Sequence, residues 1–195
     1  MNSLKYFHSD ETRILTRFGK FFGLDAAPHY LALYNNRLSE TPIKSGAQNK
    51  EIGMECTVRW QGADAGMSFV AESGSGHAVV MDGAPDAGGR NLGPRPMEML
   101  LAGTGGCTAF DVVLILKRGR HAVSGCEVKL TAERADADPK VFTNVHFHYK
   151  VKGRQLKPEV VARAIELSKD KYCSASIMLG KTAEITHDFE IIEEA

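Results

Sequence analysis

Two cysteines lie in sequence contexts in which a thiol could be chemically reactive. Cys107 follows the glycine-rich stretch Gly103–Gly106 in the middle of a long apolar segment, and Cys173 precedes a short helix-forming segment in which Ser174 is the expected N-cap. A thiolate is a nucleophile and a metal ligand, and a helix N-terminus lowers a thiol pKa whereas apolar burial raises it. The two residues are therefore candidates for a reactive pair, with a small buried hydrophobe as the alternative for each.

The remaining cysteines limit what else the chain could be. Cys56 and Cys126 lie in strand-like segments and are expected to be small buried hydrophobes. Four cysteines in 195 residues are too few and too far apart for a disulfide scaffold. None belongs to a C-x-x-C pair, which disfavours zinc. We therefore expect no metal and no cofactor, and a reducing, cytoplasmic setting.

Composition excludes further classes of protein. The chain is 43% hydrophobic and 25% charged, and its formal net charge is zero. It has no basic excess to neutralise phosphates, so nucleic acid is not an expected partner. No apolar run approaches the roughly 20 residues that span a bilayer, so a membrane is not expected either.

The periodicity of the sequence divides the chain in two. Residues 1–53 carry scattered aromatics and end in a polar stretch, and we expect a poorly ordered N-terminal extension. Residues 54–195 read as one domain. Its expected elements are strands over 54–61, 67–73 and 77–81, a helix over 97–117, strands over 125–133 and 141–151, helices over 158–171 and 174–181, and a strand over 182–192.

The segment 97–117 should form the central element. It is apolar nearly all round, so as a helix it must be buried on most sides. Each glycine inside it costs about 1 kcal/mol relative to alanine, which predicts close approach of another backbone. One monomer of this size could hardly enclose such a helix. We therefore predict a homodimer whose interface includes Gly103–Gly106.

Two motifs resemble those of a known family. Residues 94–113, PRPMEMLLAGTGGCTAFDVV, resemble the central-helix motif of the OsmC/Ohr family, and residues 164–176, AIELSKDKYCSAS, resemble its second cysteine motif. The strand GHAVVMDG over 76–83 is similar to the YhfA-like branch. The resemblance covers residues 54–195. It implies an α+β, two-layer fold in which an antiparallel sheet packs on a long buried central helix, in an intertwined homodimer.

The resemblance also implies an activity. Characterised members are thiol-dependent peroxidases that reduce organic hydroperoxides in oxidative stress defence. Carried over, Cys107 would attack the hydroperoxide and become a sulfenic acid, and Cys173 would resolve it as a disulfide. The implied partners are a hydroperoxide or other small apolar ligand and a dithiol reductant.

This sequence departs from the active pattern around the reactive thiol. Active members supply an arginine from the N-terminal strands, held by a glutamate ten residues before the cysteine. Here that position is Met97, and Glu98 would face roughly 180° away from the cysteine on an ideal helix. His77 is the only basic side chain in the strands over 67–81, so Arg90 or Arg95 is expected to take the arginine's place.

Asp111 adds a further difference. It lies one turn after Cys107 on the same helix face and would oppose thiolate formation if ionised. The alternative is that it pairs with a lysine or arginine of a second copy. Without a nearby arginine we expect the pKa of Cys107 at or above the ordinary thiol value of about 8.5. A non-catalytic, dimeric redox-sensing or small-molecule-binding protein therefore remains the alternative function.

Overall fold

The computed structural model describes residues 54–194, and the expectations for residues 1–53 lie outside that range. Every element predicted for the domain is present within a few residues of its predicted bounds. The strands are β1 (Cys56–Trp60), β2 (Ser68–Ser73), β3 (Ala78–Asp82), β4 (Ala122–Arg134), β5 (Phe142–Arg154) and β6 (Glu184–Glu193), and the helices are α3 (Pro96–Arg118), α4 (Pro158–Leu167) and α5 (Ser174–Leu179).

The strands form two separate three-stranded sheets. In the first, β1, β2 and β3 are consecutive antiparallel neighbours, and Gly76 supplies the positive φ of 85° in the turn between β2 and β3. In the second, β4 and β5 pair antiparallel over their whole length.

The last strand joins the second sheet in the other direction. β6 pairs with β5 in parallel, from Asn144 opposite Glu184 to Gly153 opposite Glu193. The prediction of an antiparallel sheet is therefore wrong for this pair. Parallel neighbours need a long crossover connection, and the helical residues between β5 and β6 supply it.

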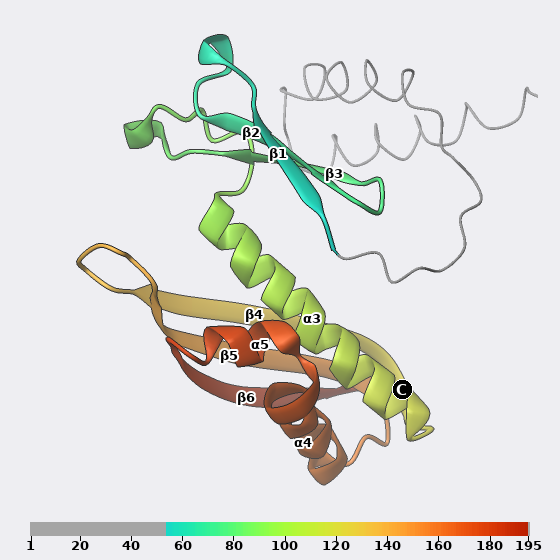
Figure 1. Cartoon of the computed structure of the whole chain (residues 1–195). Helices are drawn as coiled ribbons and strands as arrows, with labels where there is room; N and C mark the ends of the chain where they lie inside the picture. Colours follow the sequence, from blue (N-terminus) through green and yellow to red (C-terminus); the bar gives the residue numbers. More distant parts are fainter. Residues whose placement is uncertain (1–53, 195) are drawn as a thin grey trace, which may run out of the picture. The chain divides into compact units, whose positions relative to one another are not determined.

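The core lies between the second sheet and three helices. Val145, Phe147, Tyr149 and Val151 alternate along β5 toward the inner face, each at most 2% exposed. The helices α3, α4 and α5 lie on this face (Figure 1). The period of two residues thus gives β5 one apolar face and one polar face.

The central helix begins at a defined cap. Pro96 occupies its first turn, and the Glu98 carboxylate accepts the N–H of Arg95, the N-cap residue, at 2.9 Å. A proline and an acidic side chain suit the first turn of a helix, where backbone N–H groups have no helical acceptor. Glu98 is therefore a capping residue.

One face of α3 is covered and the other is open. Thr108, Val112 and Leu116 are fully buried against the sheet side, whereas Phe110 is 66% exposed. The prediction that the helix is buried on most sides is wrong for the single chain, because sheet β4–β6 and its helices cover only one side of it.

The length of α3 corrects another expectation. Its 23 residues are long and apolar enough, by length and composition, to cross a membrane. The statement that no apolar run approaches such a length is therefore wrong. One such helix is weak evidence for a membrane span, because the core helix of a soluble protein has the same properties, and α3 packs on β4, α4 and α5.

A wide helical turn joins α4 to α5. Residues Ser168–Tyr172 form a π-helical turn, and Cys173 donates its backbone N–H to the Ser168 carbonyl oxygen five residues earlier, at 2.8 Å. Such turns are rare and occur frequently at functional sites. Here the turn fixes Cys173 at the start of α5 and ties it to Ser168.

Candidate functional site

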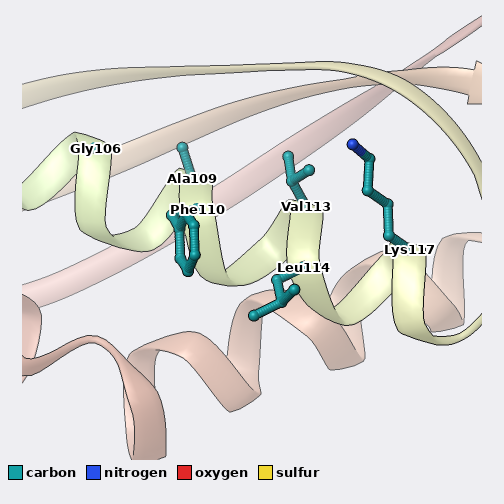
Figure 2. A pocket seen from close by; sticks show the side chains of 6 residues that line it. All are labelled: Gly106, Ala109, Phe110, Val113, Leu114 and Lys117. Carbon is teal, nitrogen blue, oxygen red and sulfur yellow. The ribbon is translucent and has the colours of Figure 1, made fainter. Parts of the chain in front are cut away.

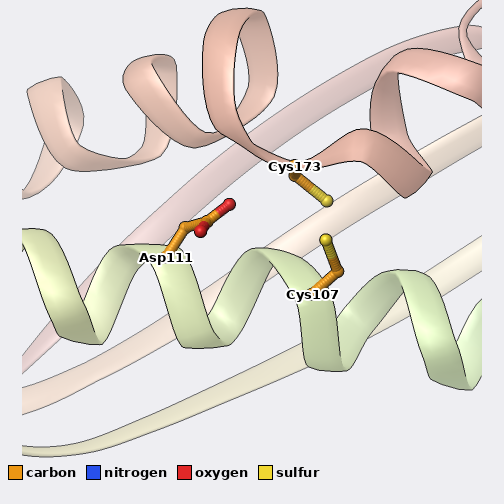
Figure 3. A group of neighbouring side chains, drawn as sticks. All are labelled: Cys107, Asp111 and Cys173. Atoms are coloured by element: carbon orange, nitrogen blue, oxygen red, sulfur yellow. The ribbon is translucent and has the colours of Figure 1, made fainter. Parts of the chain in front are cut away.

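Two thiols and a carboxylate meet between α3 and the start of α5. Cys107 and Asp111 lie one turn apart on α3, and Cys173 faces them from the end of the π-helical turn (Figure 3). The two sulfur atoms and a carboxylate oxygen all lie within 4.8 Å of one another. The structure thus brings together the two cysteines of the predicted pair and adds Asp111 to them.

The two thiols differ in exposure. Cys173 is 0% exposed, whereas Cys107 is only half-buried, and both are free thiols. The expectation that the helix over 97–117 is buried on most sides is therefore wrong at Cys107 in the single chain. Its place on the helix explains this, because Cys107 lies between the sheet-covered face that holds Thr108 and the open face that holds Phe110.

Cys173 is itself the N-cap of α5. Its sulfur accepts the backbone N–H of Ser176 at 3.4 Å and the Ser176 hydroxyl at 3.0 Å. The prediction that Ser174 is the cap is one residue off. Burial raises the pKa of the Cys173 thiol, and so does its hydrogen bond with Cys107, while the two bonds from Ser176 lower it in part.

A chain of buried hydroxyl groups ends on Asp111. The Tyr149 and Thr108 oxygens are 2.7 Å apart, and the Thr108 and Ser168 oxygens are 2.9 Å apart. Ser168 in turn donates to Asp111 Oδ2 at 3.2 Å. A hydroxyl has one proton to donate, so every bond in the chain points from Tyr149 toward the carboxylate. Burial raises the pKa of Tyr149 to about 12, which keeps it the first donor.

Sequence reasoning missed this hydroxyl chain. Thr108 and Ser168 are 0% exposed although they are polar, and each stands on an otherwise apolar helical face. A polar residue at a core position of an amphipathic helix is the signal that could have found them, since buried polar groups need partners. Within the chain Asp111 therefore has Ser168 as its partner, and its pairing with a cation of a second copy stays a prediction.

The expected arginines do not reach the thiols within this chain. The Arg90 guanidinium donates to the Asp64 carbonyl oxygen at 2.7 Å. Arg95 caps α3, twelve residues and roughly 18 Å along the helix from Cys107. Neither has a hydrogen bond or ion pair with either thiol among residues 54–194.

Two other predicted supporting residues lie elsewhere. Glu98 is engaged in the cap of α3, nine residues before Cys107. His77 lies at the turn between β2 and β3, where its ring is hydrogen-bonded to the Ser75 hydroxyl at 3.1 Å. The structure therefore brings neither of them to Cys107 within the chain.

The open face of α3 forms an apolar hollow beside the site. Figure 2 shows the side chains that line it, which all come from this one helix: Gly106, Ala109, Phe110, Val113, Leu114 and Lys117. A Cβ at Gly103 or Gly106 would meet nothing within 4 Å, whereas a Cβ at Gly105 would lie 2.8 Å from Leu130 Cδ1. Close approach at Gly105 is therefore to the chain's own sheet, and only the other two glycines face the open side.

The histidines of β5 lie on the outer face of the second sheet. Asp188 Oδ1 lies 2.5 Å from His148 Nδ1 and 3.5 Å from His146 Nε2. The hydrogen bond to Asp188 raises the pKa of His148. Both rings thus contact Asp188 on the outer face of the sheet, away from the thiols.

Comparisons with known proteins agree with this architecture. The family model described as OsmC-like protein matches residues 88–188. Protein YhfA of Escherichia coli (strain K12) is 48% identical over 139 residues, which are 71% of this chain and 98% of that protein. A solved structure from structural genomics is 45% identical with a TM-score of 0.64, over 72% of this chain and 99% of that one. An organic hydroperoxide resistance protein from Elizabethkingia anophelis shares the fold at 17% identity, with a TM-score of 0.56 over 74% of this chain and all (100%) of that one.

Proposed function

Because the chain belongs to the OsmC-like protein family, we propose that it is a thiol-dependent peroxidase that reduces organic hydroperoxides in the cytoplasm. The observation that carries the proposal is the meeting of Cys107 and Cys173, whose sulfur atoms lie within 4.8 Å of each other. The likeness of the fold to that of an organic hydroperoxide resistance protein supports it.

The proposed cycle uses each thiol once. The Cys107 thiolate attacks the distal oxygen of the hydroperoxide, the O–O bond breaks, and the leaving alkoxide takes a proton to become an alcohol. The Cys173 sulfur then attacks the resulting sulfenic acid, and the hydroxyl leaves as water. A dithiol reductant returns the disulfide to two thiols.

Asp111 fits the second step as a proton carrier. Cys173 enters that step as a thiol, because burial and its bond with Cys107 raise its pKa. The carboxylate lies within 4.8 Å of both sulfur atoms, so through one bridging water or a small side-chain movement it can accept the Cys173 proton and pass it to the departing hydroxyl. The Ser168 hydroxyl holds the carboxylate in this position.

The peroxidase is proposed to act as a homodimer. The apolar hollow along α3 exposes Phe110 and Leu114 beside a reactive thiol, and covering it would remove both from water. A second copy of α3 laid on this face would also enclose Cys107 on its open side. A small apolar hydroperoxide would then meet the thiol in a pocket shielded from water.

A redox-sensing protein is the second candidate. The observation in its favour is that Asp111, rather than an arginine, stands beside both thiols. A negative charge there disfavours the thiolate that attacks peroxide. Such a protein would form the same disulfide under oxidation but would not reduce hydroperoxide in repeated cycles.

Peroxide consumption by the reduced full-length chain separates the two candidates. With cumene hydroperoxide and a dithiol reductant, the wild type should turn over and form a Cys107–Cys173 disulfide that peptide mapping detects. Cys107→Ser should abolish consumption, and Cys126→Ser should leave the rate unchanged. Cys173→Ser, assayed without added reductant, should consume one equivalent and stop. A disulfide without turnover would favour the sensor, and over-oxidised Cys107 beside a free Cys173 would contradict the resolving role.

A further inference from the structure

We propose that Cys107, Asp111 and Cys173 in the reduced protein form a binding site for a thiophilic divalent cation of the zinc class. Each residue offers one ligand atom, and the three atoms lie within 4.8 Å of one another (Figure 3). Two thiolates and one carboxylate are a ligand set that Zn²⁺ accepts. The proposal rests on this geometry and does not require peroxidase activity.

The three atoms are close to the spacing that a tetrahedral ion needs. With Zn–S near 2.3 Å and Zn–O near 2.0–2.2 Å, the ligand atoms of a tetrahedral site lie roughly 3.3–3.8 Å apart. From separations of up to 4.8 Å, closing the triangle takes at most about 1.0–1.5 Å, which side-chain rotation supplies. Three protein ligands leave the fourth position for water or another small ligand, as in catalytic zinc sites.

Two of the three ligands already have the outer hydrogen bonds that metal ligands require. Ser168 donates to the Asp111 carboxylate, and it is itself the last of the buried hydroxyl groups that begin at Tyr149. The Ser176 N–H and hydroxyl both donate to the Cys173 sulfur. Such outer contacts fix ligand orientation and typically change metal affinity 10- to 100-fold.

The charge at the site also favours a cation. With both thiols ionised, the three side chains would carry three negative charges, and no lysine, arginine or histidine of residues 54–194 has a hydrogen bond or ion pair with any of them. A divalent ion neutralises most of that charge. Its binding displaces the two thiol protons, which leave to solvent, and the metal–sulfur bonds replace the S–H bonds.

Metal binding and oxidation of the pair exclude each other. A disulfide joins the two sulfur atoms and removes both thiolate ligands, leaving Asp111 alone. An azodicarboxamide oxidant, which takes two electrons and two protons from the thiols and becomes a hydrazine, should therefore release a bound metal. Conversely, a bound ion should protect both thiols from alkylation.

The test is titration of the reduced full-length chain with Co²⁺, followed by competition with Zn²⁺. One equivalent per chain should give thiolate-to-cobalt charge transfer and the visible bands of tetrahedral Co²⁺. Asp111→Asn should weaken binding at least about tenfold, in line with the loss of a ligand. Cys107→Ser and Cys173→Ser should each remove most of the charge-transfer intensity.

Matched controls identify the ligands. Cys56 is exposed on β1, so the expectation that it is buried is wrong, and Cys56→Ser removes an exposed thiol. His148→Ala removes the surface histidine, and both variants should bind as the wild type does. Binding that survives Asp111→Asn undiminished would overturn the three-ligand site. If His148→Ala lost metal binding and Cys107→Ser kept it, the metal would bind on the outer face of the second sheet instead.

Alkylation of the wild-type thiols tests the same site without relying on the folding of any variant. Zn²⁺ should slow alkylation of Cys107 and Cys173 at least about tenfold and leave Cys56 unchanged, as read by peptide mapping. The oxidised chain should bind no Co²⁺. If Zn²⁺ protected Cys56 from alkylation equally well, or if the reduced chain bound no metal, the proposed site would be wrong. A chain that binds metal but consumes no peroxide would contradict only the proposed peroxidase activity.

Discussion

At the scale of single residues, the site is two thiols and a carboxylate supported by buried hydroxyl groups. Thr108 is the middle of that support, because it bonds both Tyr149 and Ser168 and is 0% exposed. Asp111 receives the last bond of the chain from Ser168. A carboxylate beside two thiols is therefore held in place by Thr108 and Ser168, which among residues 54–194 form no hydrogen bond with either sulfur atom.

We expect Thr108→Val to lower the free energy of unfolding by about 1–3 kcal/mol, because Tyr149 and Ser168 then lose a buried partner. Denaturant unfolding monitored by circular dichroism measures it. Thr104→Val is the matched control, since within residues 54–194 the Thr104 hydroxyl donates to the Leu100 carbonyl oxygen of its own helix and to no other group. The control should cost less than Thr108→Val, and equal losses would show that the hydroxyl chain contributes no stability.

At the scale of elements, one carboxylate holds the loop that leads into α3. Asp82 ends β3 with its side chain buried, and its two oxygens accept the backbone N–H groups of Gly83, Arg90 and Leu92. These bonds, above all the one from Leu92, hold the pKa of Asp82 below its ordinary value of 3.8. The glycine- and proline-rich loop between β3 and α3 thus has a fixed path.

The lowered pKa of Asp82 predicts an acid sensitivity. Its contribution to stability is present above pH 3.8, the unfolded value, and is lost as pH falls through the lower folded value. Asp82→Asn should therefore lower the unfolding free energy by about 1–3 kcal/mol at pH 7 and by less at pH 2. Asp86→Asn, an exposed change in the same loop, should alter neither value. A loss that is equal at both pH values would contradict the role of the charge.

At the scale of the whole molecule, the single chain leaves apolar surface uncovered. Phe110 is 66% exposed and Leu100 is 51% exposed, both on α3, the helix that also carries Cys107. Phe110 adjoins Ala109, Val113 and Leu114 in the apolar hollow of this helix, and an exposed apolar patch of this kind marks an interaction site. The homodimer proposed above would cover it.

We expect the full-length wild type to sediment as a dimer. Phe110→Glu should weaken the association at least about 100-fold, or roughly 2.7 kcal/mol, because an ionised group would be buried in an apolar interface. Sedimentation velocity across a concentration series measures both. Arg163→Glu on the exposed side of α4 is the charge-changing control and should remain dimeric. A wild type that stays monomeric and folded at high concentration would disprove the dimer.

The sequence by itself determined the elements and indicated Cys107 and Cys173 as the candidate pair. Alternation along β5 and the apolar period of α3 are local patterns, and local patterns fix which residues form a strand or a helix. The motifs around Cys107 and Cys173 likewise identified the thiols and the family. The presence of Met97 in place of the family's glutamate could also be identified from its spacing to Cys107 alone.

Only the tertiary structure decided what surrounds those thiols. The bonds that hold Asp111 join residues 57 and 60 positions apart in the sequence, and no local pattern reports such pairs. No local pattern reports three further pairings either: β6 parallel to β5, Gly105 against Leu130, and Arg90 beside Asp64. A sequence without a C-x-x-C pair gave no reason to expect the proposed metal site, because the fold, and not the spacing, brings the two sulfur atoms and the carboxylate together.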